Sequence, residues 1–99
     1  MADVVVTDAA DERRFEARVD GELAGFLDYA RDDERIALVH TEVDPAFEGK
    51  GIGSALARFS LDTARADTIR VLALCPFVVR WVQKHPEYAG IVDYARTRD

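Results

Sequence analysis

The chain has 99 residues, of which 48% are hydrophobic, a length and composition typical of one small domain with its own core. Its 19 acidic residues outnumber its 13 basic ones, and the formal net charge of −6 disfavours nucleic acid or an anionic membrane surface as the main partner. One cysteine excludes an internal disulfide, and with only two histidines we expect no metal site of the four-ligand zinc type.

The first half of the sequence predicts antiparallel strands. Residues 4–6 form a short β-branched run, and over residues 15–19 apolar and charged side chains alternate as in a half-buried strand. Asp20-Gly21 is a two-residue hairpin signal, so the chain is expected to return as a strand over about residues 22–29. A further strand is predicted over residues 36–41.

The second half predicts a helix, a strand and a second helix. Apolar residues recur with helical spacing from Ile52, and this helix is expected to end near residues 66–67. The run TIRVLAL (residues 68–74) predicts a strand buried on both faces. Pro76 suits the first turn of a helix that continues to His85, where the imidazole is expected to cap the last turn.

The remaining sequence, EYAGIV (residues 87–92), predicts a short strand or turn, and the tail from about residue 94 is expected to fray. The fold class is therefore predicted as α+β. It has a mixed, mostly antiparallel sheet that includes one β-α-β unit, and two main helices. We expect residues 1–99 to form a single domain.

Three glycines at alternate positions precede the first predicted helix, in the segment EGKGIGS (residues 48–54). A helix N-terminus presents unpaired N–H groups, and glycines beside it leave room for a phosphate to approach the backbone. A loop whose glycines only permit a tight turn fits the spacing equally well. Neither the P-loop pattern nor the dinucleotide-binding GxGxxG pattern is matched.

Residues 48–53 (EGKGIG) resemble motif A of the GCN5-related N-acetyltransferases, [QR]xxGx[GA], with Glu48 in place of the usual Gln or Arg. With LVHTEV before this segment and LCPFV and HPEY after it, the sequence is similar to small single-domain members of that family with a truncated fold, over about residues 15–92. The resemblance implies acetyl-coenzyme A as co-substrate. Backbone amides would hold its diphosphate, and the strand that ends near Val43 would form hydrogen bonds with its pantetheine arm. The implied binding residues are Thr41, Val43, Glu48, Gly49, Lys50, Gly51, Ile52, Gly53 and Ser54.

Cys75 ends the predicted strand and directly precedes a helix start, where the helix N-terminus can lower a thiol pKa. A small buried side chain of the core is the alternative, but the resemblance places this cysteine near the thioester. His40 is a candidate general base or a structural histidine, and Glu42, on the same strand face, is a second candidate base. Longer relatives use a tyrosine to protonate the departing thiolate; Tyr88 lies in a different local context and receives no role.

The resemblance implies an N-acyltransferase that passes an acetyl group to an amine, either a small molecule or a protein lysine, without a metal. Two routes stay open: direct attack by the amine with His40 or Glu42 as base, or transfer through Cys75. A non-catalytic module that binds coenzyme A or acyl-coenzyme A is the alternative function. The acidic composition favours a cationic acceptor. Because the sequence has neither a signal-peptide pattern nor a long apolar run, we expect a cytoplasmic protein with no membrane partner.

Overall fold

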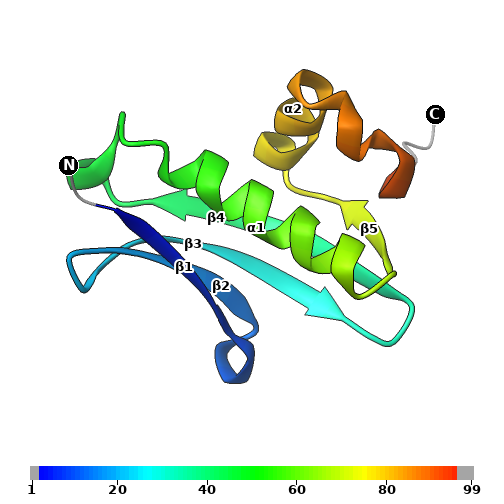
Figure 1. The fold of residues 1–99 in the computed structure, drawn as a ribbon, viewed down its shortest axis with the longest axis horizontal. Coiled ribbons are helices and arrows are strands. Elements are labelled where there is room, and N and C mark those ends of the chain that lie inside the picture. The colour runs from blue at the N-terminus through cyan, green and yellow to red at the C-terminus, as the bar shows by residue number, and fades with distance from the viewer. Residues whose placement is uncertain (1–2, 96–99) are drawn as a thin grey trace.

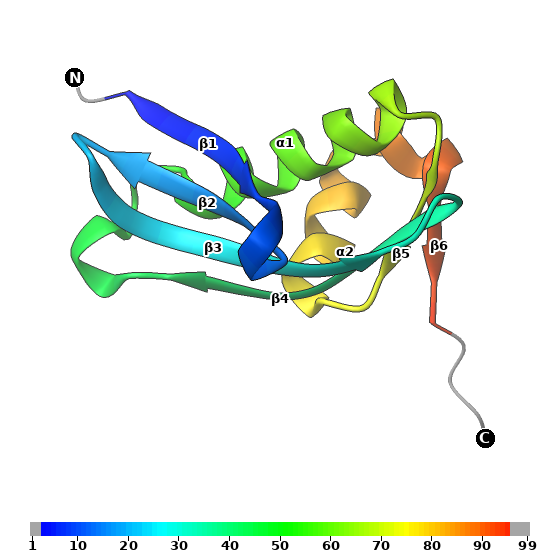
Figure 2. The same ribbon diagram turned by 90° about the horizontal axis from the view of Figure 1, so that it is seen from below.

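The structure is a computed structural model that describes residues 3–95. One six-stranded sheet is ordered as in the sequence, from β1 to β6, and both helices pack on the same face of it (Figures 1 and 2). The strands are β1 (Val4–Ala9), β2 (Arg14–Val19), β3 (Glu22–Arg31), β4 (Arg35–Val43), β5 (Arg70–Ala73) and β6 (Val92–Tyr94), and the helices are α1 (Ile52–Ala66) and α2 (Pro76–Lys84). Short 3-10 turns cover Ala10–Glu12, Pro45–Phe47 and Pro86–Ile91.

Strands β1 to β4 pair antiparallel, while β4, β5 and β6 pair parallel. The predicted α+β class with a β-α-β unit is therefore confirmed, and β5, α2 and β6 add a second such unit that was not predicted. Crossovers between parallel strands are almost always right-handed, so two of them in the same direction along the sheet place both helices on one face. Only the short turn Ala10–Glu12 separates β1 from β2.

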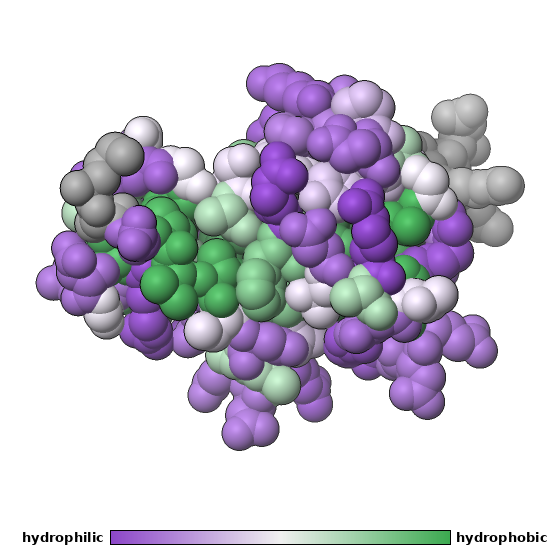
Figure 3. Space-filling model, in the orientation of Figure 1, coloured by the Kyte–Doolittle hydropathy of each residue, from purple (hydrophilic) through white to green (hydrophobic). Residues whose placement is uncertain are grey.

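The core lies between the sheet and α1, whose buried side chains recur at helical spacing. Ile52, Leu56 and Leu61 are fully or almost fully buried against Phe15 and Leu27 of the sheet. Seen from the helix side, the surface is largely polar apart from one apolar area beside β1 and the first half of α1 (Figure 3). Within residues 3–95, neither helix has the length and apolarity needed to span a bilayer.

Two strand predictions differ from the structure. Strand β5 has only four residues, because Thr68 has a left-handed φ of 56° and turns the chain out of α1. It is not buried on both faces, since Arg70 is exposed and Leu72 is half-buried. At the other end, Tyr94 still pairs with Ala73, so the sheet extends to the residue where fraying was expected. Residues 96–99 of that predicted tail lie outside the described residues.

The prediction for His85 agrees with the structure. Its Nδ1 lies 2.8 Å from the carbonyl oxygen of Trp81, in the last turn of α2, and its ring stacks on Trp81 at 3.7 Å between centroids. That the full chain is one domain stays a prediction.

Candidate functional site

Strands β4 and β5 separate at the end of β5. They pair only over Arg35–Leu38 of β4, and the last link is the Leu38 carbonyl, which accepts from the N–H groups of both Leu74 and Cys75 at 3.0 Å. Strand β4 continues to Val43, and among residues 3–95 no strand covers its edge there (Figure 1). An uncovered edge of this kind offers main-chain groups to an extended ligand.

A β-bulge at Val39 sets which groups face that open edge. Asp28 pairs with His40 and Tyr29 with Leu38, so Val39 is an extra residue on β4. Beyond the bulge, the Asp44 N–H donates to the Ala24 carbonyl of β3 at 2.8 Å. Because main-chain groups alternate along a strand, those of Thr41 and Val43 point away from β3, toward the open edge.

Cys75 lies beside this edge, as the residue that precedes the first turn of α2. It is 4% exposed, and its Sγ is 3.4 Å from Oγ1 of Thr41. Burial raises the pKa of the thiol, but the Thr41 hydroxyl and the N–H groups of Val78, Phe77 and Thr41 outweigh it and hold the pKa below its usual value. A lowered pKa increases the thiolate fraction at neutral pH, and the thiolate is the reactive form.

His40 and Glu42 lie together on the opposite, uncovered face of the sheet. His40 Nε2 is 3.8 Å from Glu42 Oε2, and the two side chains are 56% and 61% exposed. Strand alternation placed both on one face, and the geometry agrees. Because Thr41, between them in sequence, contacts Cys75 on the helix side, the sheet separates the two candidate bases from the thiol.

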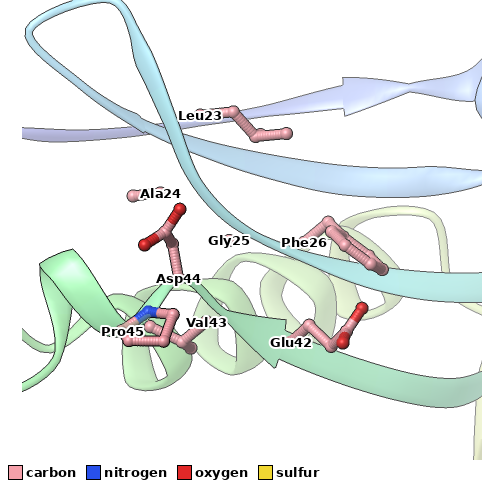
Figure 4. Close-up of a pocket in the computed structure, with 8 residues that line it drawn as sticks. All are labelled: Leu23, Ala24, Gly25, Phe26, Glu42, Val43, Asp44 and Pro45. Carbon is pink, nitrogen blue, oxygen red and sulfur yellow. The ribbon is translucent and has the colours of Figure 1, made fainter.

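Glu42 also borders a cavity of about 240 Å³ on this outer face (Figure 4). The Phe26 side chain lies beside Glu42, and Asp44 and Pro45 close the other side. The Asp44 carboxylate accepts from the Ala46 N–H at 2.9 Å and so begins the short turn that leads to the glycine segment. Sequence reasoning gave no site role to Phe26 or Asp44, because their place beside Glu42 depends on strand register.

The glycine segment carries a series of available backbone N–H groups. Gly49 and Gly51 have left-handed φ values of 80° and 75°, which favour glycine, and a Cβ at either position would meet no atom within 4 Å. The first bond of α1 runs from the Ala55 N–H to the Gly51 carbonyl at 3.0 Å, so the amides of residues 52–54 lack helical partners. The Glu48 N–H donates to Pro45 at 3.3 Å, so the available series begins at Gly49.

The sequence suggests that Gly53 leaves room for a phosphate, but the structure gives another reason for a glycine at this position. It is buried in α1, and a Cβ there would lie 2.8 Å from Cζ of Phe77 on α2. The missing side chain therefore allows the two helices to pack closely. Next to it, the Ser54 hydroxyl accepts from Nε1 of Trp81 at 2.8 Å and joins the same two helices.

Tyr88 is a structural link. It is 3% exposed, and its hydroxyl donates to Oδ1 of Asp62 at 2.6 Å and accepts from Arg58 at 3.3 Å, both on α1. The hydrogen bond to Asp62 and burial raise the pKa of Tyr88, so the phenol stays protonated at neutral pH. In the part of the chain that the structure describes, no three His, Cys, Asp or Glu side chains gather as metal ligands. The expectation of no metal stays a prediction.

Comparisons with known proteins point to one family. Residues 14–91 match the family model for GCN5-related N-acetyl-transferases. A streptothricin acetyltransferase of Streptomyces lavendulae is 44% identical over 59 residues, which cover 57% of this chain and 31% of the relative. Protein NATD1 of Xenopus tropicalis is 29% identical over 76 residues, covering 75% of this chain and 70% of the relative.

The same fold occurs in the solution structure of a GCN5-like chain from Staphylococcus aureus, with a TM-score of 0.70 and 20% identity. The alignment covers 99% of this chain and 96% of that one. By contrast, the match to the streptothricin acetyltransferase spans less than a third of that protein's length, at 31%.

Proposed function

Because this chain belongs to the GCN5-related N-acetyltransferase family, we propose that it transfers the acetyl group of acetyl-coenzyme A to an amine. The observation that carries the proposal is the end of β5, where β4 offers an open edge directly beside the Cys75 thiol. The available amides of residues 49–54 follow β4 in the chain, in the last residues before α1 and in its first turn.

These residues fit the co-substrate. The amides of residues 49–54 and the positive end of the α1 dipole suit a diphosphate, and the open Cβ positions of Gly49 and Gly51 leave space for it. Lys50 adds a positive charge to an otherwise acidic chain. The main-chain groups of Thr41 and Val43 would pair with the amide groups of the pantetheine arm. Acetyl-coenzyme A, when bound, supplies an activated thioester carbonyl.

Cys75 is proposed to be required at the acyl end. As a nucleophile, its thiolate forms a bond from Sγ to the acetyl carbon while the carbon–sulfur bond of the thioester breaks, and coenzyme A departs as a thiolate. An amine then attacks the acetyl carbon and displaces Sγ, and the departing Cys75 thiolate takes the proton that the amine loses. His40 and Glu42 lie across the sheet from Sγ and take no part in this step. In the direct route, the amine attacks the thioester itself, the carbon–sulfur bond breaks, coenzyme A leaves and takes the amine's proton, and Cys75 positions the acyl group.

Acetyl transfer is tested by incubating the protein with acetyl-coenzyme A and amines of several classes: a polyamine, free amino acids and a lysine-containing peptide. We expect one class to be acetylated, with an equimolar release of free coenzyme A thiol, both followed by mass spectrometry. If coenzyme A binds and no amine in any class is acetylated, the chain is a binding module for the cofactor and the enzymatic proposal is wrong.

A further inference from the structure

A second cavity, of about 610 Å³, lies between α2 and the end of β6. Its volume is in the range of small-molecule sites, roughly 300–1,000 Å³. Leu74 and Pro76, the two chain neighbours of Cys75, both line it, so it begins beside the proposed acyl end. The cavity that borders Glu42, on the outer face, shares no lining residue with it.

Its walls are apolar and unusually exposed. Leu74 is 43% exposed and Tyr94 is 45% exposed, and both line the cavity together with Val79. Among the residues that the structure describes, only two other large hydrophobic side chains are as exposed, and one of them is Val39, next to the last residue of β4 that pairs with β5. Exposed apolar side chains that gather at one place are typical of a surface that binds a ligand or a partner.

Among the described residues, the polar side chains that line the cavity are Arg80, Gln83 and, through its hydroxyl, Tyr94, and none of them is a carboxylate. Helix α2 carries two cations, Arg80 and Lys84, and no acid, in a chain whose net charge is −6. Arg80 forms no ion pair and no side-chain hydrogen bond with any residue in the range 3–95. An arginine of this kind suits a carboxylate, which it can bind through two parallel hydrogen bonds.

We propose that this cavity binds the acceptor, and that the acceptor is an α-amino acid with an apolar, preferably aromatic, side chain. This inference rests on the proposed acetyl transfer. The carboxylate pairs with Arg80, and the side chain packs between Leu74, Val79 and Tyr94. Arg80 lies one turn of α2 beyond Pro76, roughly 6 Å along the helix axis, so the amine of a bound amino acid is directed toward the Cys75 end. The local positive charge of α2 thus outweighs the acidic overall composition, from which a cationic acceptor was expected.

The inference is tested by comparing phenylalanine with phenethylamine, which keeps the ring and the amine but lacks the carboxylate. The ratio of their kcat/KM values is measured for the wild type, for Arg80→Gln and for Lys84→Gln. We expect Arg80→Gln to lower the phenylalanine preference at least about tenfold, since a hydrogen-bonded charge is lost. Lys84 is a cation on the same helix, but it does not line the cavity. Lys84→Gln should therefore leave the ratio unchanged. Comparing ratios cancels the different basicity of the two amines. An unchanged ratio in Arg80→Gln would overturn the inference.

A binding measurement separates this inference from the proposed activity. Phenylalanine is titrated into the isotope-labelled protein in the presence of coenzyme A, and the methyl signals of Leu74 and Val79 are followed by NMR. We expect these signals to shift in the wild type and in Lys84→Gln, and the affinity to fall at least about tenfold in Arg80→Gln. If that result holds while no amine is acetylated, the cavity binds amino acids and the acetyl transfer is wrong. If phenylalanine does not bind, or binds Arg80→Gln equally well, the cavity is not the acceptor site.

Discussion

Cys75→Ser is expected to lower turnover by about 100-fold or more and to leave the affinity for coenzyme A unchanged, because an alcohol is a far weaker nucleophile than a thiolate at neutral pH. Serine fits the space and can still hydrogen-bond to the Thr41 hydroxyl, which lies 3.4 Å from Sγ in the wild type. Steady-state rates with the preferred amine, together with calorimetric titration of coenzyme A, measure the two quantities separately.

Intact-mass measurement after incubation with acetyl-coenzyme A distinguishes the two roles of the thiol. An acetyl group on the wild type, absent from Cys75→Ser, identifies transfer through Cys75. Loss of turnover without an adduct assigns the thiol to positioning the acyl group or to proton transfer in the direct route. Full activity of Cys75→Ser would contradict both roles and make Cys75 a buried packing residue.

Gly53→Val is expected to destabilise the fold by about 1–3 kcal/mol, because its side chain would force Phe77 and α2 away from α1. A Cβ alone would already lie 2.8 Å from the Phe77 ring. Chemical denaturation of the variant measures the change in the free energy of unfolding.

A double-mutant cycle with Phe77→Ala identifies the cause. If the introduced valine side chain meets the Phe77 ring, the cost of Gly53→Val should fall when the ring is absent. Equal costs in both backgrounds would contradict the packing explanation. Gly51→Val is the matched control: its Cβ has open space, and its φ of 75° costs roughly 1–2 kcal/mol in strain whether or not Phe77 is present.

The order and type of the elements from β1 to α2 could be predicted because each rests on local sequence. Alternation gave the strand that contains Phe15, although Glu16 on its expected polar face is buried, helical spacing gave α1 from Ile52, and Asp20-Gly21 marked the hairpin. The length of β5 could not be predicted, since Thr68 and Ile69 are as strand-like as the residues after them. Their conformation follows from how the chain leaves α1, where the Ile69 N–H donates back to Ala64 at 3.0 Å.

The candidate site was predictable only in part. The free amides before α1 and the shared face of His40 and Glu42 follow from helix ends and strand period. The contact of Thr41 with Cys75 depends on the bulge at Val39, and no local signal marks that bulge in the sequence. In the sequence, Gly53 looks like its neighbouring glycines. A side chain is excluded there by Phe77, which lies 24 positions further along the chain.

The cavity beside α2 could not be predicted from the sequence either, because it also depends on contacts between distant segments of the chain. It requires β6 to pair in parallel with β5, which brings Tyr94 beside Ala73 and next to the exposed face of α2. The sequence left residues 87–92 as a strand or a turn, so nothing placed Tyr94 near Cys75. Long-range pairing of this kind is decided by tertiary packing, which local propensity does not encode.

The central claim, that coenzyme A lies on the amides before α1 and along the free edge of β4, is tested most directly by NMR titration of the 15N-labelled protein with coenzyme A. We predict that the largest amide shifts occur over residues 49–54 and at Thr41, Val43 and Cys75, with saturation at one equivalent. Shifts confined to other parts of the sheet or to the cavity beside α2, or no saturable shift at residues 49–54, would contradict the account.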